Sequence, residues 1–148
     1  PYAFAYFITD GQGADNAMAL YRANFRASET LPKPHATVCV WALAADTDEE
    51  AWALFQSRAR WRMDRNLGRI GPLLPPNEAV RDYSPAEQVA LDQLRANALV
   101  GSASTVATKL RQLAERLSLD ELVVITWTHA PEQQARSYEL LAREFALH

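Results

Sequence analysis

Four apolar runs, each followed by a segment with helical spacing, constrain the fold of this chain more than any other feature. The runs cover residues 3–8, 36–44, 97–100 and 122–127. Residues 122–127 are continuous and mostly β-branched, which is typical of a strand buried on both faces of a parallel sheet. The order therefore predicts an α/β chain of about four parallel βα units.

Spacing and capping residues predict the helices. Apolar residues recur at steps of three and four, which places them on one helix face. These positions are Ala14, Ala17, Met18, Tyr21 and Phe25; Trp52, Phe55, Ala59 and Met63; Val106, Leu110, Leu113 and Leu117; and Ala135, Tyr138, Ala142 and Phe145. Thr47 and Ser84 each precede a glutamate by three residues, the spacing of a capping box. The helix after Ser84 is an extra one, and residues 67–83, rich in Gly and Pro, form an inserted loop.

Four βα units fit either an open doubly wound sheet or half of a (β/α)8 TIM barrel. A closed barrel needs about 250 residues, and this chain has 148. A free-standing closed barrel is therefore excluded. Because the sequence enters an apolar run directly after Pro1, we expect the chain to be a piece of a longer protein.

Charge and cysteine content limit the partners. The 15 basic and 18 acidic residues give a net charge of −3 and are mixed along the chain, so we expect neither nucleic acid nor a membrane as a partner. Cys39 is the single cysteine, and no apolar run could span a bilayer. These features predict a reduced, cytoplasmic protein. The His, Cys and carboxylate spacing predicts no metal site.

His129 is the strongest candidate for chemistry because it follows residues 122–127. Parallel α/β folds build their sites at the carboxyl ends of the strands. A histidine there could donate a hydrogen bond to a ligand or act as an acid or base near neutral pH, although an ordinary loop histidine is the alternative. Trp127 belongs either to the core or to a surface that packs against a flat cofactor.

Two glycine-containing turns are candidates for binding a nucleotide or an anion, but each has a simpler structural interpretation. Gly11 and Gly13 lie between a strand and a helix, but Asn16 replaces the third glycine of a dinucleotide-binding turn, which favours a flexible loop. Residues 101–105 open a helix that could hold an anion, but a simple serine cap is the favoured interpretation.

Several stretches in register resemble the bacterial luciferase-like flavin-dependent monooxygenases. They are PYAFA at 1–5, ADTDEEA at 45–51, VGS at 100–102 leading into Thr105, Val106 and Leu110, and DELVV at 120–124 followed by RSYELL at 136–141. The resemblance covers nearly the whole chain. It implies that residues 1–148 are the C-terminal half of a (β/α)8 barrel, with strands five to eight and an insertion at about 67–83.

The same resemblance implies the chemistry. In this family reduced FMN, supplied by a separate flavin reductase, reacts with O2 at the barrel mouth, and an organic substrate is oxidised. In this family, the segment that binds the FMN phosphate lies just upstream of the stretch that resembles residues 1–5. The resemblance therefore implies that this segment is absent from the chain. The missing N-terminal half, or a second copy of the chain, is the expected partner. These residues do not distinguish FMN from a deazaflavin, or an aldehyde from a long-chain hydrocarbon or a polyketide.

The resemblance also implies pocket residues. Tyr6, Phe7 and Ile8 are expected at the mouth after the first strand, and Trp127 and Thr128 after the last. His129 is the expected catalytic residue beside them. The alternative function is a non-catalytic half-barrel module that hides its open sheet edges by self-association.

Overall fold

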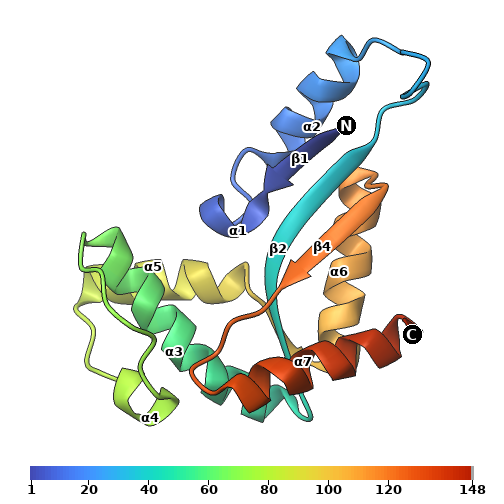
Figure 1. The fold of residues 1–148 in the computed structure, drawn as a ribbon. Helices are drawn as coiled ribbons and strands as arrows, with labels where there is room; N and C mark the ends of the chain where they lie inside the picture. Colours follow the sequence, from blue (N-terminus) through green and yellow to red (C-terminus); the bar gives the residue numbers. More distant parts are fainter. Residues whose placement is uncertain (148) are drawn as a thin grey trace. The chain divides into compact units, whose positions relative to one another are not determined.

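The computed structural model describes residues 1–147 and has strands and helices in alternation (Figure 1). The strands are β1 (Tyr2–Ala5), β2 (Ala36–Ala45), β3 (Leu99–Ser102) and β4 (Glu121–Ile125). The helices are α1 (Tyr6–Thr9), α2 (Ala14–Asn24), α3 (Asp48–Asn66), α4 (Pro76–Ala79), α5 (Pro85–Ala96), α6 (Ala103–Leu117) and α7 (Pro131–Glu144). All strand pairs are parallel, so the predicted α/β class with a parallel sheet is confirmed.

Strand β2 is the common partner of the other strands. Its residues Thr37, Val38 and Cys39 pair with β1 and with β4, so β2 lies between these two strands. Strand β3 pairs with the other end of β2, along Ala42–Ala45. Strand β4 pairs directly with β2, although β3 precedes it in the chain. The ten residues of β2 explain this, because a strand of that length has room for both shorter partners.

The chain divides into two compact units. Unit 1 comprises residues 1–41 and 108–125, and unit 2 comprises residues 42–107 and 126–148, of which 126–147 are described. Strand β2 and helix α6 each contribute residues to both units.

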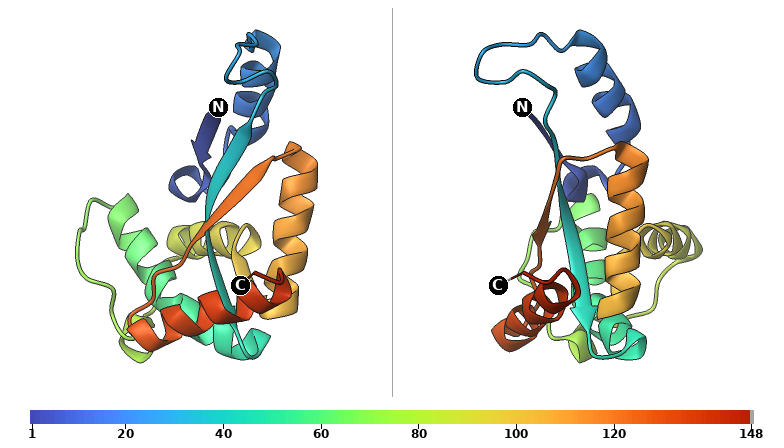
Figure 2. Two further views of the ribbon diagram at one scale, coloured as in Figure 1. Left: turned by 45° about the vertical axis from the view of Figure 1, so that its right-hand side comes forward. Right: turned by 90° about the vertical axis from the view of Figure 1, so that its right-hand side faces the viewer.

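In unit 1, one face of the sheet is covered and the other is partly open. Helix α2 and the end of α6 lie on one side of this sheet (Figure 2). Ala36, Val38 and Val40 are fully buried, so we assign them to the covered face. On the opposite face Cys39 is half-buried and its partner Val123 is 39% exposed. The prediction that the last strand is buried on both faces is therefore wrong, because nothing in unit 1 covers Val123.

Unit 2 has its own core around the end of β2. Helix α3 packs on β3, α4 and α5. Leu43, Phe55, Leu91, Val100 and Val106 are almost completely buried. The helix face predicted from residues 106–117 is confirmed across both units, since all four of its leucine and valine positions are buried.

The capping predictions are largely confirmed. Ser84 and Glu87 form a complete capping box, with Pro85 in the first turn of α5. Thr47 accepts a hydrogen bond from the Glu50 N–H at 3.1 Å, which caps α3. The Glu50 carboxylate, however, accepts from the N–H of Asp46 rather than that of Thr47.

The first predicted strand, residues 3–8, is wrong in its second half. The strand ends at Ala5, and Tyr6, Phe7 and Ile8 lie in the helical turn α1. The Gly11 N–H donates to the Tyr6 carbonyl at 3.1 Å and closes this turn. A short apolar run cannot distinguish strand from helix by its period, and here the glycine downstream decides.

The predicted inward face of the last helix is also wrong. Ala135 is exposed and Tyr138 is 39% exposed, whereas Ser137 and Leu141 are buried. The Ser137 hydroxyl accepts a hydrogen bond from the Ala44 N–H at 2.9 Å. Helix α7 meets backbone donors near the end of β2, so a polar residue occupies its inward face.

Candidate functional site

The segment after β4 is fixed by polar contacts within unit 2. Thr126 is 2% exposed, and its hydroxyl donates to the Ala42 carbonyl at 2.6 Å. Its N–H donates to the Tyr138 hydroxyl at 2.8 Å, and its carbonyl accepts from the Gln134 side chain. Every polar group of Thr126 thus has a partner, which holds the start of the 126–129 segment in one position.

Trp127 lies in an arginine–tryptophan cluster formed by Arg58, Trp61 and Trp127. The two rings meet edge to face with centroids 6.4 Å apart. The Arg58 guanidinium lies 4.7 Å from the Trp127 centroid and 5.2 Å from that of Trp61. Arg58 is only 4% exposed, and such a desolvated cation–π contact contributes about 2 kcal/mol. The cluster therefore combines flat apolar surfaces with a buried positive charge.

Thr128 and His129 complete the segment. The Thr128 hydroxyl donates to the Ala130 carbonyl at 2.7 Å. His129 is exposed, and its Nδ1 lies 2.9 Å from the Leu73 carbonyl oxygen in the insertion loop. A carbonyl only accepts, so Nδ1 carries the hydrogen in this contact. In the neutral ring Nε2 is then the atom that can accept a proton.

Tyr6, Phe7 and Ile8 belong to unit 1. Tyr6 and Phe7 are half-buried, and Ile8 is 48% exposed. The Tyr6 ring packs against Gly11, where an added Cβ would lie 2.2 Å from the ring. Gly11 therefore makes room for Tyr6, which accounts for this glycine without a nucleotide.

The second glycine turn is occupied by a carboxylate of the chain itself. Asp48 accepts from the Ser102 N–H at 2.5 Å and from the Thr105 hydroxyl at 3.4 Å. The Ser102 hydroxyl accepts from the Thr105 N–H, as the favoured cap interpretation predicts. This helix start thus already holds an anion.

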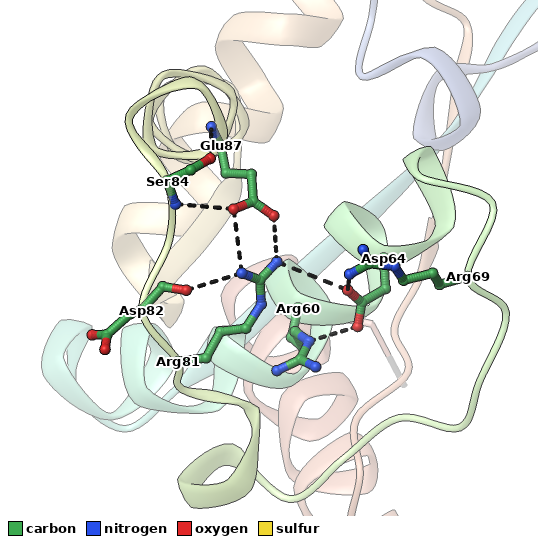
Figure 3. A network of polar contacts seen from close by, with 7 residues as sticks. All are labelled: Arg60, Asp64, Arg69, Arg81, Asp82, Ser84 and Glu87. Atoms are coloured by element: carbon green, nitrogen blue, oxygen red, sulfur yellow. Dashed lines mark hydrogen bonds and ion pairs between the residues drawn. The ribbon is translucent and has the colours of Figure 1, made fainter.

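A polar network connects the end of α3, the insertion loop and α5 (Figure 3). Arg81 binds both oxygens of the Glu87 carboxylate, at 2.6 and 3.3 Å, and also lies 3.9 Å from Asp64. Hydrogen bonds from Arg81 and from the Ser84 N–H lower the pKa of Glu87 to about 2. The Glu87 contact also raises the pKa of Arg81. Asp64 further accepts from Arg60 at 2.5 Å and lies 4.0 Å from Arg69.

A small pocket of about 110 Å³ lies beside this network. Its wall includes Arg60, Trp61, Asp64 and Arg69. Trp61 belongs to the arginine–tryptophan cluster as well, so the cluster and the pocket share a side chain. His129 contacts the same insertion loop at Leu73, next to the pocket residue Leu74.

The sequence prediction that charges are mixed along the chain did not identify the concentration of arginine around the end of α3 and the insertion loop. Residues 57–81 contain six arginines and only two carboxylates. The arginines are Arg58, Arg60, Arg62, Arg65, Arg69 and Arg81. A sliding count of charge along the sequence would have found this stretch, whereas the net charge of the whole chain conceals it.

Neither a metal-binding group nor a membrane-spanning helix is found among residues 1–147. No group of three or more His, Cys, Asp or Glu side chains within that range is arranged to hold a metal ion. None of the helices in the same range combines the length and apolar character that a membrane span requires.

The chain is similar to known proteins over nearly its whole length. It is 35% identical over 147 residues to the uncharacterized protein YwcH of Bacillus subtilis strain 168, covering 98% of this chain and 44% of YwcH. It is 33% identical over 142 residues to a luciferase-like monooxygenase of Escherichia coli strain K12, covering 95% of this chain and 42% of that protein. No family model matches the sequence.

The chain also has a fold similar to that of a solved structure. The crystal structure of apo-MsnO8 superposes with a TM-score of 0.85 and 29% identity, covering 100% of this chain and 45% of MsnO8. The chain thus spans less than half the length of the relatives it matches. Its similarity to a luciferase-like monooxygenase, at 33% identity along almost the whole chain, supports the resemblance to that family read from the sequence.

Proposed function

We propose that this chain is the C-terminal half of a (β/α)8 barrel in a luciferase-like, flavin-dependent monooxygenase. The observation that carries the proposal is the 33% identity over 142 residues to the luciferase-like monooxygenase of Escherichia coli, of which the match covers 42%. In the complete protein, reduced FMN and O2 would oxidise an organic substrate.

The partly open face of unit 1 supports the barrel. Ala5, Cys39 and Val123 lie in one row across β1, β2 and β4, on the face opposite the helices. In a closed barrel that face points inward, where side chains from all the strands fill the interior. The 39% exposure of Val123 is then explained if the remaining strands come from the missing half of the protein.

The alternative, a non-catalytic half-barrel that self-associates, is supported by the same face. A second copy could cover Val123 and the free edges of β1 and β4. The molar mass of the chain in sedimentation equilibrium distinguishes the two. A stable homodimer with no affinity for flavin favours self-association, whereas association with the remaining half favours the enzyme.

The arginine–tryptophan cluster fits a flavin. Trp61 and Trp127 offer flat apolar surfaces, and Arg58 adds a positive charge. A reduced flavin is flat and carries negative charge at neutral pH, so both features are complementary to it. When bound, reduced FMN would supply the electrons that activate O2 for transfer of one oxygen atom to the substrate. A segment upstream of residue 1 would hold the FMN phosphate.

The other residues would shape the pocket and handle protons. Within unit 1, Tyr6, Phe7 and Ile8 would form apolar pocket walls that exclude water. Within unit 2, Thr128 would supply a polar pocket group. Because its Nδ1–H donates to the Leu73 carbonyl, His129 would take up or release a proton at Nε2. In this role His129 is the catalytic residue.

The test measures binding before turnover. The complete protein is titrated anaerobically with reduced FMN or a reduced deazaflavin while tryptophan fluorescence is followed. We expect one of them to bind and Trp127→Phe to weaken that binding, whereas Trp52→Phe, a change on the same helix as Trp61, leaves it unchanged. A flavin reductase and O2 are then added with aldehyde, alkane and aromatic polyketide substrates. Failure to bind either cofactor contradicts the proposal.

A further inference from the structure

We propose that the pocket between the end of α3 and the insertion loop binds an oxyanion group, a phosphate or a carboxylate. Its volume of about 110 Å³ suits a group of that size rather than a whole organic molecule. Arg60 and Arg69 both line it, and guanidinium groups bind oxyanions through paired hydrogen bonds. Gly71, also in the wall, lets the backbone approach without a side chain.

Arg60 is oriented for this task by Asp64. The Arg60 Nε donates to Asp64 Oδ2 at 2.5 Å, and this is an i,i+4 contact on one face of α3. Within residues 1–147 the two terminal nitrogens of Arg60 have no acceptor, and Figure 3 shows them turned away from the Asp64 carboxylate. The edge formed by the two terminal nitrogens remains available for a bidentate contact with an oxyanion. Asp64 is therefore a positioning residue.

Arg69 provides a second, movable guanidinium. Its side chain is 68% exposed, and it lies 4.0 Å from Asp64, at the outer limit of an ion pair. So weak a contact costs little to break, and an exposed pair of this kind contributes little to stability. Arg69 can thus turn toward an anion in the pocket while Arg60 stays fixed.

The local charge favours an anion despite the acidic chain. Arg60, Arg69 and Arg81 share only two carboxylates, those of Asp64 and Glu87. The Arg58 and Arg65 guanidiniums lie 5.2 and 5.3 Å from the Trp61 ring, which is itself part of the pocket wall. This positive excess raises the local concentration of anions.

The proposed function assigns the FMN phosphate to a segment upstream of residue 1. The substrate is therefore the expected source of the oxyanion, and the FMN phosphate is the alternative source. Assignment to either source rests on the proposed function, but the existence of the site does not. Inorganic phosphate is therefore the first probe, and FMN is compared with riboflavin, which lacks the phosphate.

The test uses thermal unfolding of the complete protein in phosphate, with chloride at equal ionic strength as the reference. Phosphate should raise the melting temperature of the wild type, because a ligand that binds only the folded state stabilises it. Arg60→Gln should weaken phosphate binding by about tenfold, the loss expected for one charge-assisted contact. Arg69→Gln changes a side chain that is 68% exposed, so we expect little loss of stability, and it should weaken phosphate binding less. Arg26→Gln, an exposed arginine of unit 1, is the matched control.

An equal phosphate response in the wild type, Arg60→Gln and Arg69→Gln overturns the site, as does the absence of a phosphate response in the wild type. A phosphate response that is weaker in Arg60→Gln than in the wild type, with Arg26→Gln unchanged, supports it. If Arg60→Gln weakens FMN but not riboflavin, the flavin phosphate occupies the pocket; if both bind unchanged, the substrate supplies the anion. Normal flavin binding without a phosphate response overturns this inference but leaves the proposed function intact.

Discussion

Two buried serines of unit 2 provide a matched test of how helix α7 is attached. Ser137 on α7 is fully buried, and its hydroxyl accepts from the Ala44 N–H at 2.9 Å. Ser57 on α3 is 2% exposed, and its hydroxyl has no hydrogen-bond partner within residues 1–147. The change to Ala removes the same atom at both positions but a hydrogen bond at only one of them.

The two substitutions should affect stability differently. In Ser137→Ala the Ala44 N–H loses its acceptor, and Ala44 is only 1% exposed, so water cannot replace the hydroxyl. An unsatisfied buried donor costs about 1–3 kcal/mol. Alanine is the better helix former by about 0.5 kcal/mol, which offsets part of this cost. We therefore expect Ser137→Ala to destabilise the protein by about 1–2 kcal/mol. Ser57→Ala should be neutral or stabilising by up to about 1 kcal/mol, because it removes a buried hydroxyl without a partner.

Urea unfolding followed by far-UV circular dichroism measures both changes. The midpoint should fall for Ser137→Ala with an unchanged slope, and it should hold or rise for Ser57→Ala. In a melt, a change of 1 kcal/mol shifts the midpoint by about 2–4 °C for a chain of this size. Equal losses in the two variants, or no loss in Ser137→Ala, would refute the assignment of the Ala44 contact.

Three further predictions concern separate residues. His129→Ala in the complete protein should lower kcat with little change in the urea midpoint, and unchanged kinetics would remove His129 from the site. The pKa of Glu87 is depressed to about 2. The ionised Glu87 carboxylate therefore stabilises the folded protein above its ordinary pKa of about 4.5, and this stabilisation is lost as the pH falls from 4.5 toward 2. Urea midpoints at pH 6 and pH 3 should therefore differ less in Arg81→Gln than in the wild type, and an equal drop in both would contradict this coupling. Gly11→Ala should lower the free energy of unfolding by more than about 1 kcal/mol, because the φ of Gly11 is +84° and the new Cβ would collide with Tyr6. A urea midpoint equal to that of the wild type would show that the Tyr6 ring moves aside freely.

The sequence predicts the long elements of this fold well, because their patterns repeat over many residues. The helix that became α6 has four apolar positions in register, and all of them are buried. The caps at Thr47 and Ser84 depend on local chemistry within four residues, so they too could be predicted. The parallel arrangement of the strands could be predicted from the alternation of apolar runs and helical segments.

The predictions that were wrong concern features that depend on tertiary contacts. The turn at Tyr6 forms because Gly11 accepts the ring beside it, and an aromatic run of six residues contains no sign of that. The inward face of α7 was misassigned because Ser137 is buried through its bond to Ala44, whereas pattern analysis counts serine as a surface residue. Of the candidate site, Trp127 was proposed from its place at the end of a strand and stays a prediction, whereas its contacts with Arg58 and Trp61 could not be predicted. They lie on α3, and the pairing with Trp127 is visible only after folding.

The division of β2 and α6 between the two units has a consequence for how the protein is cut and assembled. Each unit is built from two stretches that are far apart in the chain, residues 1–41 with 108–125 and residues 42–107 with the remainder. Neither unit can therefore be expressed as one uninterrupted segment. Closing such long loops delays folding until distant stretches meet, so truncation from either terminus should remove part of a unit and leave an incomplete core rather than a smaller stable domain.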